Sequence, residues 1–320
     1  MTFQSPKMAS RPTIYIPNLN GRAHLTPLME GLRAQSREAE VVIVDNGSSD
    51  GSAELLRSRF PEVELIELGE NLGFGPALNR AVAATSGDPV VLLNNDVVCE
   101  PRFVEALLDA GAAGAEMVAG VLLMERDPGF IDSAGVIADR TLMGFDYLNG
   151  EPREAVRTAA APLGPTGGAA LFSRAAFDAV GGFDERIFLY YEDLDLALRL
   201  RARGARCELA PEAAAVHAYS QTLGAASGAK YVRTGWSRGY MLRRYGVMGR
   251  PRDGLRVLAA EGAICAGQLL RDRTAKGLVG RLRGWRDARG LPPREAAAEG
   301  IGDLSLREAL ALRRARRGPR

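Results

Sequence analysis

A chain of 320 residues, 46% apolar and 25% charged, has the composition of a globular protein and can form one large domain with an additional segment. No run of about eighteen apolar residues occurs, which argues against a membrane-spanning helix, and three scattered cysteines without a CxxC pair indicate reduced thiols, not a disulfide framework or a zinc site. The net charge of +2 conceals a division: residues 1–230 hold 20 Lys and Arg against 31 Asp and Glu, whereas residues 231–320 hold 21 against 8.

The first half of the chain alternates short apolar runs with helical patterns. The apolar runs are continuous, as is typical of buried parallel strands. A β-α-β-α order predicts an α/β fold, with a mainly parallel sheet flanked by helices. The predicted strands are Thr13–Pro17, Val41–Val44, Val63–Glu67 and Pro89–Leu93, and the helices are Leu25–Ala34, one opening near Ser49–Gly51, Gly75–Ala84 and Pro101–Ala110.

The pattern changes after Val121. Residues 130–150 predict a hairpin or flap, and residues 151–165 a surface loop. From Lys230 onward the pattern is helical, which divides the chain into a domain over 12–228 and a helical basic extension over 229–320. The remaining predictions are a small-residue strand or turn at Thr166–Ser173, helices at Arg174–Val180 and Glu192–Arg203, short strands at Arg206–Leu209 and Ala213–Val216 that end at His217, and helix breaks at Gly246–Pro251 and Gly290–Pro293.

Polar residues follow three of the predicted strands. They are Pro17 to Gly21 (PNLNG), Asp45 to Gly51 (DNGSSDG), and Asn94 to Asp96 (NND). In an open parallel sheet, ligands bind beyond the carboxyl ends of the strands. Ser49 or Asp50 alone could be a helix cap. Three clusters at one edge favour a nucleotide pocket.

Residues 184–200, DERIFLYYEDLDLALRL, place aromatic residues beside an acidic helix start. A helix N-terminus stabilises a carboxylate, and aromatic walls exclude water around it. Glu192 and Asp193 therefore suit removal of a proton from a bound hydroxyl, although both could be simple helix-terminal charges. Asp195 is expected to cap the helix or to pair with Arg199.

Together these segments resemble the family 2 glycosyltransferases, in particular their bacterial rhamnosyltransferase-like branch, over residues 12–246. The resemblance implies a GT-A fold and an inverting transfer from a nucleotide-diphosphate sugar, helped by Mg²⁺ or Mn²⁺. The segments that carry it are IYIPNLN, VVIVDNGSSDGS, ENLGFGPALNRA, VVLLNNDVVCEP, the stretch from GGAALFSR to LRLRARG, and AVHAYS.

The resemblance also implies roles for single residues. One carboxylate of the Glu192–Asp193 pair acts as the base, and we prefer Asp193. Asp96 and His217 hold the metal, although a lone histidine after an apolar strand is more often a core residue. The donor-binding positions are Pro17, Asn18, Asn20, Asp45, Asn46, Asn71, Gly73, Asn79, Asn95 and Asp96.

Two positions depart from the family pattern: Asn46 stands where a second Asp is frequent, and Asn94 replaces the first acid of the DxD motif. Both changes remove negative charge, so we expect weak metal binding without the donor diphosphate. On the acceptor side we place Gly167, Gly168 and Tyr191, because glycine lets a ligand approach the backbone. A tight structural turn is the alternative for the two glycines.

We therefore predict a glycosyltransferase that builds a cell-surface glycan or lipid-linked saccharide, with dTDP- or UDP-sugar donors implied by the resemblance. One alternative is a sugar-phosphate nucleotidylyltransferase, but PNLNGRAHLTP lacks the Gly-rich signature with Arg and Lys that such an enzyme needs. Another alternative is a non-catalytic scaffold at a membrane surface with a vestigial nucleotide pocket.

The basic segment 231–320 has two explanations: solvated helix faces, or attachment to an anionic membrane surface. No recognition motif supports nucleic-acid binding. The start MTFQSPKMASRP has no apolar signal core. We expect a cytoplasmic protein, peripheral at most on the inner face of the cell membrane.

Overall fold

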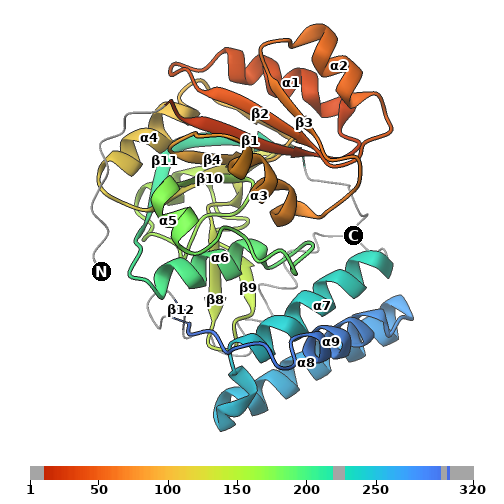
Figure 1. The fold of residues 1–320 in the computed structure, drawn as a ribbon. Coiled ribbons are helices and arrows are strands. Elements are labelled where there is room, and N and C mark those ends of the chain that lie inside the picture. The colour runs from red at the N-terminus through yellow and green to blue at the C-terminus, as the bar shows by residue number, and fades with distance from the viewer. Residues whose placement is uncertain (1–10, 219–227, 297–300, 303–320) are drawn as a thin grey trace.

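The computed structural model of the protein describes residues 11–218, 228–296 and 301–302 (Figure 1). The alternation predicted for the first half is confirmed, and one three-residue strand is added to it. The elements are β1 (Thr13–Asn18), α1 (Arg22–Arg33), β2 (Glu40–Asp45), α2 (Ser52–Arg59), β3 (Glu64–Glu67), α3 (Phe74–Ala84), β4 (Val90–Leu93), β5 (Val97–Cys99) and α4 (Phe103–Ala112).

The second half contains more strand than predicted. The predicted hairpin is confirmed by the antiparallel pair β8–β9. The two short strands predicted before His217 were wrong, because they form one strand, β11, with a register shift between Leu209 and Ala214. The elements are β6 (Met117–Met124), β7 (Asp127–Ser133), β8 (Val136–Asp139), β9 (Gly144–Asp146), η1 (Arg153–Arg157), β10 (Ala169–Phe172), α5 (Arg174–Ala179), α6 (Glu192–Arg201) and β11 (Cys207–His217).

The C-terminal part is helical, as predicted. A break at residues 246–251 is confirmed, and a further break at residues 273–275 was not predicted. No helix in the described ranges is long and apolar enough to cross a membrane. The elements are α7 (Gly228–Arg244), η2 (Val247–Gly249), α8 (Pro251–Asp272), α9 (Lys276–Asp287) and the short β12 (Ile301–Gly302).

Nine of the described strands form a main sheet in the order β3-β2-β1-β4-β10-β6-β11-β5, with β7 added beside β6, and a smaller sheet has the order β12-β8-β9. The pairs β1–β2, β2–β3, β1–β4 and β6–β11 are parallel. The small-residue strand β10 is antiparallel to both of its neighbours. The parallel half brings the carboxyl ends of β1, β2 and β4 to one edge.

Helices cover both faces of this sheet (Figure 1). Along β1, Ile14 and Ile16 pack with α1 and α4, whereas Tyr15 points to the other face and packs with α3. This alternation follows from the two-residue period of a strand. Tyr240 and Met241 of α7 belong to the same core as Tyr15, so the change in charge along the chain does not separate α7 from the sheet.

Buried ion pairs tie the C-terminal helices together and to the region around α6. Glu261 of α8 lies 2.6 Å from both Arg238 of α7 and Arg281 of α9. Burial raises the pKa of Glu261, but the two guanidinium groups outweigh it and lower the pKa to about 2. Arg294 bridges Asp184 at 2.8 Å and Asp195 at 2.5 Å. These contacts hold the helices beside the start of α6.

Candidate functional site

Side chains at the carboxyl ends of β1, β2 and β4 form one hydrogen-bonded network. Asn18 is fully buried, and its Nδ2 donates to Oδ1 of Asp45 at 3.0 Å and to Oγ of Ser48 at 3.1 Å. Its Oδ1 accepts from Nδ2 of Asn95 at 2.8 Å. The parallel register pairs Asn18 with Asp45. The structure thus brings three predicted donor-side residues together.

The loops after β1 and β2 are joined by further polar contacts. Asn20 has a left-handed backbone (φ 51°), and its Oδ1 accepts from the backbone N–H of Ser49 at 2.9 Å. The carboxylate of Asp50 accepts from the backbone N–H groups of Arg22 and Ser52. Asp50 thus ties the starts of α1 and α2 together, but it is not the N-cap residue of either helix, because Gly21 and Gly51 occupy those positions. Pro17 lies half-buried near the end of β1.

Asn46 braces the turn over residues 71–73. Its Nδ2 donates to Oδ1 of Asn71 at 3.1 Å and to the Gly73 carbonyl at 3.0 Å, and its Oδ1 accepts from the Leu72 N–H at 2.8 Å. A carboxylate has no hydrogen to donate. The double donor role gives a physical reason for an amide, and not a carboxylate, at position 46.

The turn held by Asn46 touches the loop that precedes α6. The Phe74 N–H donates to the carbonyl of Phe188 at 2.9 Å. Gly73 has a φ of +100°, and a Cβ there would lie only 2.4 Å from the same carbonyl oxygen. Glycine at position 73 therefore lets this loop approach the donor-side turn.

Asn79 is occupied by the same loop. Its Nδ2 donates to the carbonyl of Phe183, and its Oδ1 accepts from the N–H of Phe183, both at 2.9 Å. Because both ends of the amide serve the backbone of Phe183, the observed role of Asn79 is to position the loop. Its predicted contact with the donor stays a prediction.

Two consecutive tyrosines before α6 have left-handed backbones. Tyr190 has a φ of 69° and Tyr191 a φ of 71°. Each such residue costs about 1–3 kcal/mol and persists only where its surroundings enforce it, and such residues cluster at functional sites. The conformation places Glu192 and Asp193 in the first turn of α6. Tyr191 is half-buried.

The two acids of this turn differ in environment. Glu192 is 7% exposed, and its Oε2 has no hydrogen-bond partner. Burial, together with the neighbouring charge of Asp193, raises the pKa of Glu192 to about 8. Asp193 is half-buried and accepts from the Leu194 N–H at 2.7 Å. Asp195 pairs with Arg199 at 2.7 Å, which confirms the predicted ion pair.

His217 lies between two carboxylates at the end of β11. Its Nδ1 is 2.7 Å from Oδ2 of Asp132, and its Nε2 is 3.3 Å from Oδ1 of Asp96. Burial lowers the pKa of His217, but hydrogen bonds to the two carboxylates outweigh it and raise the pKa to about 10. Nδ2 of Asn94 lies 3.5 Å from Nε2. Asp132 lies in β7, within a segment that the sequence predicts only as a hairpin or flap, so sequence reasoning missed it.

Asp96 and His217 lie together but do not complete a metal site, and His217 has to release its Nε2 proton before that nitrogen can bind a cation. Across the described residues, no group of three or more His, Cys, Asp and Glu is arranged to hold an ion. Carboxylate oxygen suits Mg²⁺ and Mn²⁺, and Mg²⁺ commonly takes further ligands from substrate phosphates and water. The pair therefore fits a cation that arrives with a diphosphate.

The two predicted acceptor-side glycines allow close packing. A Cβ on Gly167 would lie 2.8 Å from the ring of Phe74, and one on Gly168 would lie 2.9 Å from Nδ2 of Asn94. Gly168 also accepts at its carbonyl from the Asn94 N–H. Close packing in a tight structural turn is enough to explain both glycines, and their contact with an acceptor stays a prediction.

Comparison with known protein sequences identifies relatives of this chain. The sequence profile of glycosyl transferase family 2 matches residues 13–181. An N-acetylglucosaminyl-diphospho-decaprenol L-rhamnosyltransferase of Mycobacterium tuberculosis is 33% identical over 226 residues, which cover 63% of this chain and 74% of that protein. The succinoglycan biosynthesis protein ExoA of Rhizobium meliloti is 34% identical over 208 residues, or 60% of this chain and 58% of the relative.

Solved structures share the fold at lower sequence identity. A mannosyltransferase from Pyrobaculum calidifontis, in complex with GDP-Man and Mn²⁺, superposes with a TM-score of 0.52 at 19% identity and covers 87% of both chains. S. aureus TarS 1–349, in complex with UDP, superposes with a TM-score of 0.50 at 15% identity, over 87% of this chain and 89% of that one. At these identities the likeness concerns the fold alone.

Proposed function

Since this chain belongs to glycosyl transferase family 2, we propose that it transfers a sugar from a nucleotide-diphosphate sugar to a hydroxyl of a cell-surface glycan or a lipid-linked acceptor. The GT-A fold implied by the resemblance is confirmed by the superposed transferases. The observation that supports the proposal best is the network of Asp45, Asn18 and Asn95 at one sheet edge, with Asp96 next in the chain. Family membership argues against the nucleotidylyltransferase alternative.

In this proposal the strand-end network binds the donor. Asp45 holds the base and ribose through the carboxylate that Asn18 and the Ser48 N–H already orient. The turn braced by Asn46 backs the base and diphosphate. A dTDP- or UDP-sugar is the proposed donor. The proposed donor residues are Pro17, Asn18, Asn20, Asp45, Asn46, Asn71, Gly73, Asn95 and Asp96.

Asp96 and His217 would hold the divalent cation in this account, with Nε2 of His217 giving up its proton as the cation arrives with the donor diphosphate. When bound, such a cation neutralises the charge that develops on the leaving diphosphate. Asp132 does not touch the cation in this account, but it fixes the ring of His217 through Nδ1. Carboxylates in this position orient metal-binding histidines in many proteins.

Asp193 is the proposed general base. Attack of the acceptor hydroxyl on the anomeric carbon requires removal of its proton, and a positioned carboxylate contributes roughly 10²–10⁴-fold to such a step. A single displacement inverts the anomeric centre and needs no protein nucleophile. Glu192, with its pKa raised to about 8, holds its proton at neutral pH. Glu192 is therefore the second choice for the base, because it has to lose this proton before it can accept one from the acceptor hydroxyl.

The helical extension over 229–320 is the proposed membrane contact. Leu255, Leu258, Leu269 and Leu270 of α8 are exposed, with Leu270 at 80%, and their spacing keeps them on one side of the helix. Leu278 and Leu282 are exposed on α9. Apolar side chains among many arginines suit an anionic lipid surface. We place the protein on the inner face of the cell membrane, held peripherally and without a spanning helix.

A panel of nucleotide sugars tests the donor side of this proposal. A ligand bound only by the native state raises stability by about 2.7 kcal/mol at one hundred times its Kd. We expect a UDP- or dTDP-sugar with Mn²⁺ or Mg²⁺ to raise the melting temperature, and Asp45→Ala to abolish the shift. The absence of a shift with every nucleotide sugar and cation would contradict the proposed donor site.

A further inference from the structure

A cavity of about 530 Å³ lies between α7, α9 and the loop that precedes α6. Four cationic side chains and two aromatic rings are among the residues that line it, and no lining residue in the described part of the chain is acidic. Its size is that of a small-ligand site. The residues that carry the argument are Arg186, Arg233, Lys276, Arg283, Phe188 and Trp236.

The cavity shares a wall with the proposed catalytic loop. Phe188 and Leu189 line it, and Tyr190, Tyr191 and Glu192 follow them directly in the chain. From α7, Ser237 donates its hydroxyl to the Leu189 carbonyl at 3.0 Å. The carbonyl of Phe188 accepts from Phe74 on the donor-side turn. The loop thus has the cavity on one side and the donor-side turn on the other.

One of the four cationic groups, Arg233, is fixed by an aromatic contact, and the other three are exposed. The guanidinium of Arg233 lies 3.6 Å from the centre of the Phe188 ring, and partial burial lowers the pKa of Arg233. On α9, Lys276 and Arg283 are seven residues apart, which puts them on one side of the helix. The Nζ of Lys276 lies close to the backbone of Gly228 at the start of α7, which puts this ammonium group at the α7–α9 wall of the cavity.

Close packing of α7 on α9 fixes the shape of the cavity. A Cβ on Gly239 of α7 would lie 2.0 Å from the carbonyl oxygen of Arg281, and one on Gly280 of α9 would lie 2.3 Å from the carbonyl oxygen of Val232. Both helices therefore need glycine at the contact. Asp184 lies 3.8 Å from Arg186 and offsets part of its charge. The like charges around the cavity otherwise repel one another, and an anion between them offsets that repulsion.

We propose that this cavity binds the phosphate or diphosphate group of the acceptor, the group through which a sugar is linked to its lipid carrier. This inference rests on the proposed transferase function and names the acceptor's chemistry. Guanidinium groups bind phosphate through paired N–H donors. Phe188 and Trp236 supply faces on which the neighbouring sugar or the first carbons of the lipid pack.

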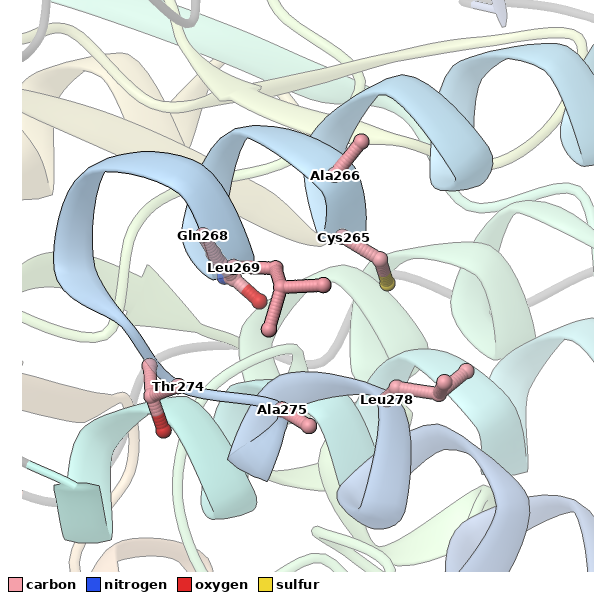
Figure 2. A pocket seen from close by; sticks show the side chains of 7 residues that line it. All are labelled: Cys265, Ala266, Gln268, Leu269, Thr274, Ala275 and Leu278. Atoms are coloured by element: carbon pink, nitrogen blue, oxygen red, sulfur yellow. The ribbon is translucent and has the colours of Figure 1, made fainter.

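The apolar surface of the C-terminal helices lies across α9 from the cavity. Leu278 and Leu282 are two and six residues after Lys276, so the helical period puts them on the side of α9 opposite Lys276 and Arg283, and Leu282 is 63% exposed. A smaller, mainly apolar pocket of about 130 Å³ lies on that side, between α8 and α9, and Leu269, Leu278 and Cys265 line it (Figure 2). We therefore assign to the charged cavity only the phosphate and the groups next to it.

The test uses the double variant Lys276→Ala with Arg283→Ala in the full-length protein. The control, Arg271→Ala with Arg289→Ala, removes two exposed arginines that do not line the cavity. Steady-state kinetics compare two acceptors that carry the same sugar, one on a prenyl diphosphate and one on a phosphate-free alkyl chain. We expect the ratio of kcat/KM for the two acceptors to fall at least tenfold in the double variant and to stay unchanged in the control. An equal loss on both acceptors, or a rise confined to the donor KM, overturns the proposal.

A binding experiment separates this proposal from the transferase function. Titration of the protein with a short-chain prenyl diphosphate in detergent requires neither turnover nor a bilayer. We expect the wild type to bind it and the double variant to bind at least tenfold more weakly, even if no acceptor is glycosylated. If the double variant binds the prenyl diphosphate normally and loses only binding to phosphatidylglycerol vesicles, the cavity holds a membrane headgroup and the proposal is wrong.

Discussion

Asp132 orients His217: its Oδ2 lies 2.7 Å from Nδ1 of the ring, which leaves Nε2 facing Asp96 at 3.3 Å. The two residues are 85 positions apart in the sequence, and β7 and β11 reach each other through β6, which pairs with both. Because the hydrogen bond fixes the direction of the ring, we assign Asp132 a positioning role in the proposed metal site.

Asp132→Asn is expected to weaken Mn²⁺ binding in the presence of a nucleoside diphosphate by about 10–100-fold, the usual effect of losing the carboxylate behind a metal-binding histidine. Titration calorimetry or the Mn²⁺ paramagnetic resonance signal measures the affinity directly, without turnover. Asp127→Asn, on the exposed start of the same strand, is the control. Unchanged Mn²⁺ affinity in Asp132→Asn would remove the positioning role.

Asn46→Asp is expected to destabilise the protein and to weaken donor binding. The carboxylate cannot donate to the Gly73 carbonyl, and one buried unsatisfied group costs about 1–3 kcal/mol. Urea denaturation measures the first effect, and titration with the donor measures the second. Asn20→Asp is the matched control, because Oδ1 of Asn20 only accepts, and a carboxylate can do the same. Equal stability of the two variants would show that the brace is unimportant.

Glu192→Gln is expected to stabilise the protein at alkaline pH. The pKa of Glu192 in the folded protein, about 8, lies above its ordinary value of 4.5. Between these two pH values the folded chain therefore keeps a proton that the unfolded chain loses. Protonated Glu192 makes its whole contribution to the free energy of unfolding below about pH 4.5, and this contribution is lost as the pH rises through 8.

Chemical denaturation at pH 5 and pH 8.5 measures the effect. The stability advantage of Glu192→Gln over the wild type should be larger at pH 8.5 than at pH 5. Glu185→Gln, which changes an exposed acid in the same loop, should give no such pH dependence. An advantage that does not change with pH would contradict the raised pKa of Glu192.

Leu270→Ser combined with Leu282→Ser is expected to reduce binding to phosphatidylglycerol vesicles by at least about tenfold, since burying one leucine contributes about 1.5–3 kcal/mol. Vesicle co-sedimentation measures the binding. Because surface charge is screened by salt, binding should also fall at about 1 M ionic strength. Val98→Ser, at an exposed apolar residue of β5, should bind like the wild type. Vesicle binding unaffected by both the leucine changes and salt would exclude this surface.

The sequence was most informative in the first half of the chain, where the strands are parallel and alternate regularly with helices. Asp45 and Asn95 could be placed at one edge, because buried strands and helices alternate up to β4 and parallel strands share their carboxyl ends. Asp132 could not be placed, because its partner His217 is far away in the sequence and β7 has neither a strong apolar alternation nor a motif. The position of α7 against the core was also missed, since its arginines suggest a solvated helix while Arg238 is fully buried against Glu261.

The most direct test of the account is transfer to a prenyl-diphosphate-linked sugar acceptor. Mass spectrometry follows the addition of the sugar and NMR gives the anomeric configuration, with wild type and Asp193→Asn incubated side by side with UDP- and dTDP-sugars and Mn²⁺. The account predicts that the wild type adds one sugar with inverted anomeric configuration. Asp193→Asn should be at least about 10²-fold slower, because the general base is lost, while it still binds the donor. Transfer by Asp193→Asn at the wild-type rate, or no transfer by the wild type from any of these donors, would contradict it.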